Sequence, residues 1–216
     1  YARGNLMPLT DRSGFGPIAP RTIQVFITPG SDTWTRPQGC THIRVQLVGA
    51  GGGGAGYCEA GGAGGYSEKY INVQDIASVA LTIGSGGSRI SYYGVGTNGT
   101  STSFGTYLSA SGGFGANAHY SHEGGRGGLG SGGHVNLYGG KGSGHGDSMG
   151  SWGPNTGGAS YFGGSHGRQH SNNNSQDDDR HCAWGAGGTG GDTDGGNPHG
   201  SNGNHGAIVV YEYYNS

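Results

Sequence analysis

Residues 124–134 read GGRGGLGSGGH, with a glycine at every third position. This ridge consists of Gly124, Gly127, Gly130 and Gly133. The same spacing recurs in residues 185–191, and glycines three apart also occur in the run GAGGGGAG at residues 49–56. Three residues per turn is the period of the polyproline II helix, whose backbone forms no internal hydrogen bonds and offers its N–H and C=O groups to neighbours. The spacing therefore predicts several packed polyglycine II helices.

Composition explains why backbone contacts matter in this chain. Glycine accounts for 54 of 216 residues, hydrophobic residues for 31% and charged residues for 11%. Ordering each glycine costs about 0.5–1 kcal/mol more than ordering alanine, so backbone hydrogen bonds must supply much of the stability. Irregular glycine-rich loops remain an alternative interpretation, because chance spacing of three is common in such runs. Only seven prolines and the lack of a strict Gly-X-Y repeat exclude collagen.

Charge and hydropathy exclude two classes of partner. A formal net charge of -2 leaves no basic surface for nucleic acid, so we expect no nucleic-acid partner. No stretch approaches the roughly 20 apolar residues of a membrane span, so we expect no membrane insertion. The chain begins at Tyr1 rather than at Met, and we expect a fragment or a processed product. The odd set Cys40, Cys58 and Cys182 fits isolated thiols, with a Cys58–Cys182 bridge as the alternative.

Alternating polar and apolar residues predict an antiparallel β platform. In THIRVQLV, residues 41–48, the side chains of Ile43, Val45 and Leu47 are expected on one face of a half-buried strand. The preceding RPQGC predicts a turn with a positive φ at Gly39. Similar strand patterns occur in TIQVFI, SDTWT, GGYSEKYINV, SVALTIG, TSTSFGTYLSAS and the closing GAIVVYEYYNS. We predict an all-β protein in which the closing strand pairs with strands far back in the sequence.

These patterns divide the chain into three parts. Residues 1–21 contain three prolines and no hydrophobic period, which predicts an extended N-terminal arm or attachment segment. Residues 22–111 plus 206–216 are expected to form the β platform. Residues 112–205 hold almost no aliphatic side chains, and we expect them to form an inserted, glycine-rich distal region of polyglycine II helices and loops.

Aromatic and polar side chains concentrate between the glycine runs of residues 112–205. Nine of the ten histidines follow residue 112. Tyr and Trp give broad and stiff contact area, whereas His, Asn, Asp and Ser form hydrogen bonds, which is typical of recognition surfaces and of saccharide binding. The alternative is that the aromatic residues cap the glycine helices and fill a small core. The candidate binding residues are Tyr120, His122, Tyr138, His145, Trp152, Tyr161, His166, His170, His181 and Trp184.

The order of these segments resembles the glycine-rich domain at the tips of bacteriophage tail fibres and related receptor-binding adhesins. The resemblance covers about residues 22–213, and its most specific parts are VQLVGAGGGGAG and the closing GAIVVYEY. It implies an extracellular part of the virion whose platform attaches to the rest of the tail fibre and whose loops bind a bacterial surface glycan or outer-membrane protein, as a monomer or a homotrimer. The loop NNNSQDDDRHC and the many histidines differ from that family's pattern.

Metal and enzyme interpretations have weaker support in the sequence. The run RQHSNNNSQDDDRHC at residues 168–182 and GDTDGGN at residues 191–197 contain ligand types, but neither has the spacing of a zinc or calcium site. The few glutamates occur in no recognisable catalytic setting, and GAGGGGAG lacks the Lys-Ser/Thr ending of a phosphate-binding loop. We expect no catalytic residue, no metal and no cofactor.

Two functions therefore remain in competition. One is a tail-fibre adhesin that binds its receptor by weak contacts multiplied over several copies. The other is a glycine-rich structural protein that assembles into an extracellular filament or matrix. A closed oligomer is expected for the adhesin and open assembly for the filament.

Overall fold

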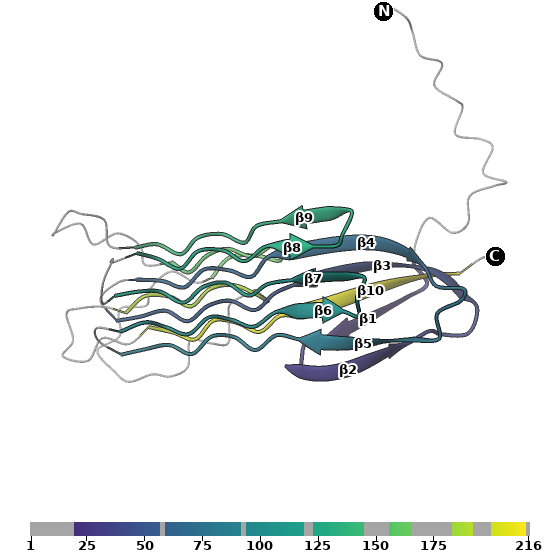
Figure 1. The fold of residues 1–216 in the computed structure, drawn as a ribbon, viewed down its shortest axis with the longest axis horizontal. Coiled ribbons are helices and arrows are strands. Elements are labelled where there is room, and N and C mark those ends of the chain that lie inside the picture. Colours follow the sequence, from purple (N-terminus) through teal and green to yellow (C-terminus); the bar gives the residue numbers. More distant parts are fainter. Residues whose placement is uncertain are drawn as a thin grey trace, which may run out of the picture.

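Ten strands in the described part of the computed structural model form two five-stranded antiparallel sheets (Figure 1). The structure describes residues 20–56, 59–91, 94–118, 123–144, 156–165, 183–191 and 200–214. No helix occurs in these ranges, which confirms the prediction of an all-β protein with an antiparallel platform. The described part accordingly has no helix long and apolar enough to cross a membrane.

The two sheets contain strands from distant parts of the sequence. The first sheet has the order β1 (Thr22–Phe26), β10 (Ala207–Tyr214), β3 (Cys40–Val48), β4 (Tyr66–Asn72) and β9 (Val135–Leu137). The second sheet has the order β2 (Gly30–Thr35), β5 (Ser78–Ile83), β6 (Thr102–Phe104), β7 (Leu108–Ala110) and β8 (Gly130–Ser131). The closing strand β10 pairs with both β1 and β3, as the sequence predicted.

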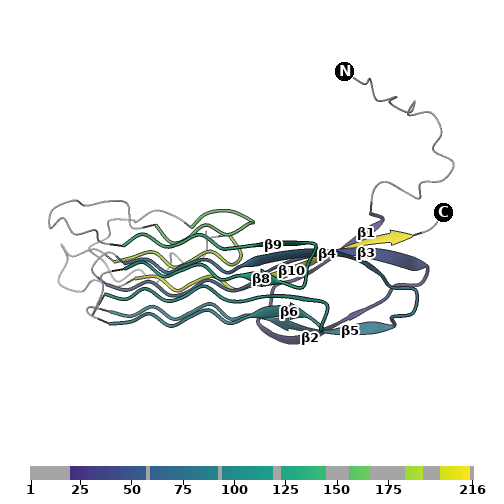
Figure 2. The ribbon, with the colours of Figure 1, turned by 45° about the horizontal axis from the view of Figure 1, so that its top comes forward.

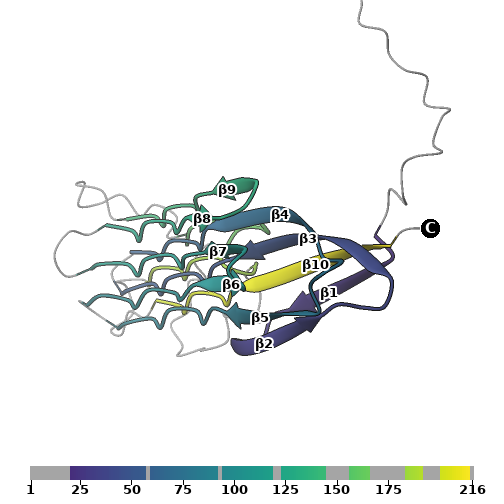
Figure 3. The ribbon, with the colours of Figure 1, turned by 45° about the vertical axis from the view of Figure 1, so that its right-hand side comes forward.

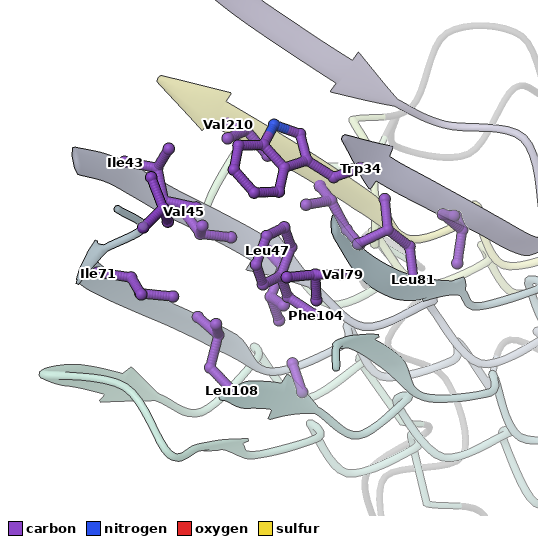
Figure 4. Close-up of a cluster of buried hydrophobic side chains, with 14 of the residues drawn as sticks. Trp34, Ile43, Val45, Leu47, Ile71, Val79, Leu81, Phe104, Leu108 and Val210 are labelled. Carbon is purple, nitrogen blue, oxygen red and sulfur yellow. The ribbon is translucent and has the colours of Figure 1, made fainter. Parts of the chain in front are cut away.

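A side-chain core fills the space between the two sheets of the platform (Figure 4). Ile43, Val45 and Leu47 on β3 are all 0% exposed, which confirms the face predicted from their alternation. Trp34 on β2 is also fully buried, and its ring lies 5.9 Å from that of Phe104. Burial of such side chains contributes roughly 25 cal/mol for each Å² of apolar surface removed from water.

Turns and one buried carboxylate complete the platform. Gly39 has a φ of 81°, as predicted for the turn before β3. Glu212 on β10 is fully buried and accepts hydrogen bonds from Trp34 Nε1 at 2.8 Å and from Gln24 Nε2 at 2.7 Å. These donors join β1 and β2, the first strands of the two sheets, to β10. Cys40 is a buried free thiol, and burial raises its pKa.

The strands continue beyond the platform as extended segments that together form a bundle (Figures 1 and 2). Strand β3, for example, runs into segment 49–56, and segment 59–65 returns into β4. The described bundle segments are 49–56, 59–65, 84–90, 94–101, 111–118, 123–129, 138–144, 156–160, 183–191 and 200–206. Most of them extend platform strands, so the platform fixes where those segments begin.

Backbone hydrogen bonds within the bundle repeat every three residues. In segment 49–56, the N–H groups of Gly49, Ala50 and Gly51 donate to three different neighbours, and the next three residues donate to the same neighbours in the same order. These neighbours are segments 59–65, 94–101 and 200–206. Packed polyglycine II helices remain our interpretation of the bundle, and this period of three is the observation that supports it.

The same hydrogen bonds arrange the described segments in three layers (Figure 3). Segments 49–56 and 59–65 lie at the centre, and each is bonded to three neighbours as donor and to three others as acceptor. The middle layer contains segments 84–90, 49–56, 59–65 and 138–144. One outer layer contains segments 94–101, 111–118 and 123–129, and the other contains segments 156–160, 183–191 and 200–206.

Close approach of neighbouring backbones explains the glycine content. A Cβ atom added at Gly62 would overlap the carbonyl oxygen of Arg126, and one at Gly127 would overlap that of Gly139. Both would lie closer than the 3.0 Å that real Cβ atoms keep from other heavy atoms. The bundle draws its segments from both the 22–111 and the 112–205 parts of the sequence, because hairpins of the platform extend directly into it.

Candidate functional site

Most candidate binding residues fall in ranges that the structure leaves out. Tyr138, Tyr161 and Trp184 are described, and the other seven lie outside the described residues. Those seven are Tyr120, His122, His145, Trp152, His166, His170 and His181. Both runs considered for metal binding also extend into these ranges, as do Cys58, Cys182 and most of the expected arm. Among the described residues, no group of three His, Cys, Asp or Glu side chains could hold a metal ion.

The ends of the described segments show where several of these ranges attach. Segments end at residues 56, 91, 118, 144 and 191, and the described chain resumes at residues 59, 94, 123, 156 and 200. These positions lie at the end of the bundle opposite the platform (left in Figure 1). The start of β1 and the end of β10 lie side by side at the other end, because Thr22 pairs with Glu212.

Tyr161 and Trp184 lie at the junction between bundle and platform. The ring of Tyr161 stacks on that of Tyr66 with centroids 3.6 Å apart and an interplanar angle of 14°. Phe162 contacts Tyr66 edge-on at 6.3 Å and Trp184 edge-on at 5.6 Å. A reversal of the chain presents these rings, since Ser160 and Gly163 exchange backbone hydrogen bonds. Tyr161 is 50% exposed, so one part of it packs and the other faces solvent.

A charged network lies under this aromatic cluster on the outer face of the first sheet. Arg44 donates to both oxygens of Glu68 at 2.9 Å, Tyr66 Oη donates to Glu68 at 2.6 Å, and Gln46 Nε2 donates to Glu68 at 2.9 Å. The hydrogen bonds from Arg44 lower the pKa of Glu68 to about 2, against the opposing effect of burial. Burial, and then the hydrogen bond to Glu68, raise the pKa of the Tyr66 hydroxyl. Glu68 is therefore ionised at neutral pH and holds the buried Tyr66 beneath Tyr161.

This network was not predicted, although the sequence carries a signal for it. The alternation that places Ile43 and Val45 in the core also places Arg44 on the opposite face of β3. The register of β3 with β4 sets Arg44 opposite Tyr70 and Gln46 opposite Glu68. Arg44 also lies 5.8 Å from the ring centre of Tyr70 and 5.4 Å from that of Tyr211. The sequence alone does not show that β3 pairs with β4, and only this pairing brings these residues together.

A second surface follows one outer layer of the bundle, formed by segments 94–101, 111–118 and 123–129. Its solvent-facing side chains recur every third residue and form columns along the segments. They are Val95, Asn98 and Ser101, then Ser111, Phe114 and Asn117, then Glu123, Arg126 and Leu129. We call these nine residues the flat face. Tyr138, which is 75% exposed, and Lys141 lie beside it on segment 138–144.

Backbone hydrogen bonds also set the register between the columns of the flat face. The Phe114 N–H donates to the Arg126 carbonyl at 2.9 Å, and the Ser111 N–H donates to the Leu129 carbonyl at 3.0 Å. Leu129 in turn forms an isolated bridge with Tyr138. Each side chain of one column therefore has a counterpart at the same height in the next. Of these residues only Tyr138 was predicted as a binding residue; the three-residue spacing of Glu123, Arg126 and Leu129 is the signal that would have found the others.

A family model that matches most of the chain identifies the family of this protein. The model of the glycine-rich domain family matches residues 27–214, which is nearly the whole described fold. The chain belongs to this family. No curated protein matches the chain. In this glycine-rich domain, the match covers both sheets from β2 onward together with the whole bundle, so platform and bundle form a single family unit.

Proposed function

We propose that this glycine-rich domain is the tip of a bacteriophage tail fibre and attaches the phage by binding a polysaccharide or an outer-membrane protein on the bacterial surface. The observation that carries the proposal is the polarity of the described fold. The start of β1 and the end of β10 meet at the platform end, whereas described segments end and resume at the opposite end of the bundle. One end is thus suited to attachment and the other to display.

The hydrogen-bonded bundle supports such a display role. Segment 59–65 donates to neighbours on three sides and accepts from neighbours on three others. A bundle cross-linked in this way resists bending in every direction, so the far end keeps a fixed orientation relative to the platform. The ends of the described segments therefore keep a fixed arrangement, and preorganisation of this kind favours affinity.

The proposal also assigns partners and a location. The platform joins the rest of the tail fibre, the domain works as a monomer or within a homotrimer, and it lies on the outside of the virion. Recognition is non-covalent, by weak contacts of aromatic and polar side chains multiplied over the copies of the fibre. Neither a cofactor nor an enzymatic step is part of this mechanism.

One observation favours the alternative of a self-assembling structural protein. Strand β1 is an edge strand of the first sheet, and its Ile23 and Val25 are 54% and 47% exposed. An exposed apolar edge strand is a template on which further strands can pair. If this edge pairs with another copy in an open arrangement, filaments rather than discrete particles result.

A binding assay on intact bacteria separates the two functions. The purified, fluorescently labelled protein is applied to a panel of strains, and light scattering measures its mass on the same sample over a range of concentrations. Strain-restricted binding by a species of constant mass supports the adhesin. Absence of binding to every strain, with a mass that rises with concentration, overturns it in favour of the filament.

A further inference from the structure

We propose that the flat face, together with Lys141 beside it, binds a linear acidic polysaccharide whose sugars carry carboxylates, along the row formed by Asn98, Phe114, Arg126 and Lys141. This inference rests on the proposed function, because it names the class of glycan and a surface that would bind it. It places the contact on the side of the bundle, in addition to any contact at the far end.

Hydrogen bonds between neighbouring segments align the four residues of the row. Phe114 and Arg126 are joined directly by the backbone bond from N–H to carbonyl. Asn98 is held beside them, because its Oδ1 accepts the N–H of Gly115 at 2.9 Å. Lys141 is opposite Arg126, since the N–H groups of Gly139 and Gly142 donate to the carbonyls of Gly128 and Gly125 in an antiparallel register. The row therefore crosses four adjacent segments.

The spacing of this row suits a chain of sugar rings. Hydrogen-bonded extended chains lie about 5 Å apart, so successive residues of the row are separated by about that distance. A pyranose ring is comparable in length with one such step. Successive rows along a segment are about 9 Å apart, because three residues of polyproline II helix rise by that amount. A polysaccharide lying across the segments thus meets one side chain per sugar.

Two cations in the row have no anionic partner among the described residues. Arg126 and Lys141 are both exposed, and the ion pair that the described residues form joins Arg44 to Glu68 on the platform. Glu123, the nearest carboxylate on the same segment, lies in the next row. The two cations can therefore share a ligand carboxylate, for which the planar guanidinium of Arg126 provides two parallel donors.

Phe114 and Asn98 supply the contacts that a neutral part of the sugar needs. Phe114 is 51% exposed, so its ring offers a flat apolar surface beside the two cations. Sugar rings carry apolar C–H faces that pack on such rings, and the fixed amide of Asn98 has N–H donors for hydroxyl groups.

The rest of the surface excludes competing ligands of the same charge. Backbone N–H groups of the neighbouring segments are already bonded to carbonyls, as at Gly99, Phe114 and Gly142, so they offer no nest for a free phosphate. A net charge of -2 and only two cations in the row give too little positive potential for nucleic acid. Carboxylates spaced along a neutral sugar backbone fit this combination of groups best.

The test measures binding of the full chain to polygalacturonate and to its methyl ester, which keeps the sugar backbone but removes the charge. Calorimetry or affinity electrophoresis is expected to show binding to polygalacturonate that weakens as salt is added and is lost with the methyl ester. Arg126→Gln and Phe114→Leu should each lower the affinity about tenfold, which corresponds to about 1.4 kcal/mol. Arg89→Gln removes the same charge from segment 84–90, outside the flat face, and should leave the affinity unchanged.

The outcomes separate this inference from the proposed function. Absence of binding to polygalacturonate, equal binding to the ester, or equal losses for Arg126→Gln and Arg89→Gln would each overturn the role of the row. Attachment to intact bacteria is measured with the same variants, and thermal unfolding confirms that each one is folded. If the polygalacturonate test overturns the role of the row but the protein still attaches to bacteria, the adhesin proposal stands. The receptor is then bound by another part of the domain. If polygalacturonate binding behaves as expected but no strain is bound, the face is a glycan site and the tail-fibre proposal fails.

Discussion

The platform and the bundle are continuous along the chain but are stabilised in different ways. In the platform, bulky side chains such as Trp34 and Leu47 fill the space between two sheets. In the bundle, glycine brings the backbones so close that their N–H and C=O groups bond in three directions. Where strands such as β3 end, the main stabilising interaction therefore changes from side-chain burial to backbone hydrogen bonding. Removing side-chain volume should damage the platform, whereas adding volume should damage the bundle.

The largest effect is expected from one added methyl group at the centre of the bundle. In Gly62→Ala the new Cβ would overlap the Arg126 carbonyl, and segment 59–65 cannot move because it is bonded to neighbours on all sides. We expect a loss of at least about 3 kcal/mol in the free energy of unfolding, measured by chemical denaturation. Gly164→Ala is the matched control, because no atom lies within 4 Å of its added Cβ. Equal stability of the two variants would contradict backbone packing as the principle of the bundle.

The converse substitution should harm the platform. Leu47→Ala removes a fully buried side chain from between the sheets and leaves a cavity. The expected loss is about 2–5 kcal/mol, again measured by denaturation. Val25→Thr changes a half-exposed residue on β1 and should stay within about 0.5 kcal/mol of the wild type. A Leu47→Ala protein as stable as the Val25→Thr protein would show that side-chain burial is not what holds the platform.

The sequence predicted the platform better than the bundle for a physical reason. Alternation along residues 41–48 identifies both the strand and its buried face, because each residue of a strand reports its own burial. Glycine spacing predicts the period of the bundle segments. Glycine spacing does not reveal which segments become neighbours, because one glycine ridge can pack against any other equally well. The placement of segments 49–56 and 59–65 at the centre follows from their continuity with β3 and β4.

The candidate residues show the same contrast. Tyr161 and Trp184 were chosen by residue type as binding residues, and the structure places both at the junction, where Tyr161 packs on Tyr66. The aromatic pairing depends on the register of β4 with the bundle, which residue type does not encode. Phe114 and Arg126 were overlooked because their alignment arises only when two segments bond side by side.

A smaller effect links the charged network at the junction to acid stability. The folded pKa of Glu68 is about 2, below its ordinary value of 4.5, so the folded protein binds fewer protons than the unfolded chain between these values. The stabilisation from Glu68 is therefore complete above pH 4.5 and is lost as the pH falls from there through 2. At pH 7 we expect the free energy of unfolding of the wild type to exceed that of Glu68→Gln by about 2 kcal/mol, and this difference should shrink below pH 4. Denaturation of both proteins from pH 7 to pH 2 measures this difference, and a constant gap across that range would contradict it.

The smallest effect concerns the aromatic contact that joins bundle to platform. Tyr161→Ala removes the ring that stacks on Tyr66, while the backbone reversal at Ser160 and Gly163 keeps its own hydrogen bonds. Aromatic pairs contribute about 0.5–1.5 kcal/mol beyond burial, so we expect a loss of about 1 kcal/mol with the fold retained. Tyr138→Ala is the control, because Tyr138 is 75% exposed and should change stability little. If Tyr161→Ala leaves stability unchanged but reduces attachment to bacteria, Tyr161 serves recognition. A loss of stability with normal attachment instead means that its ring fastens the bundle to the platform.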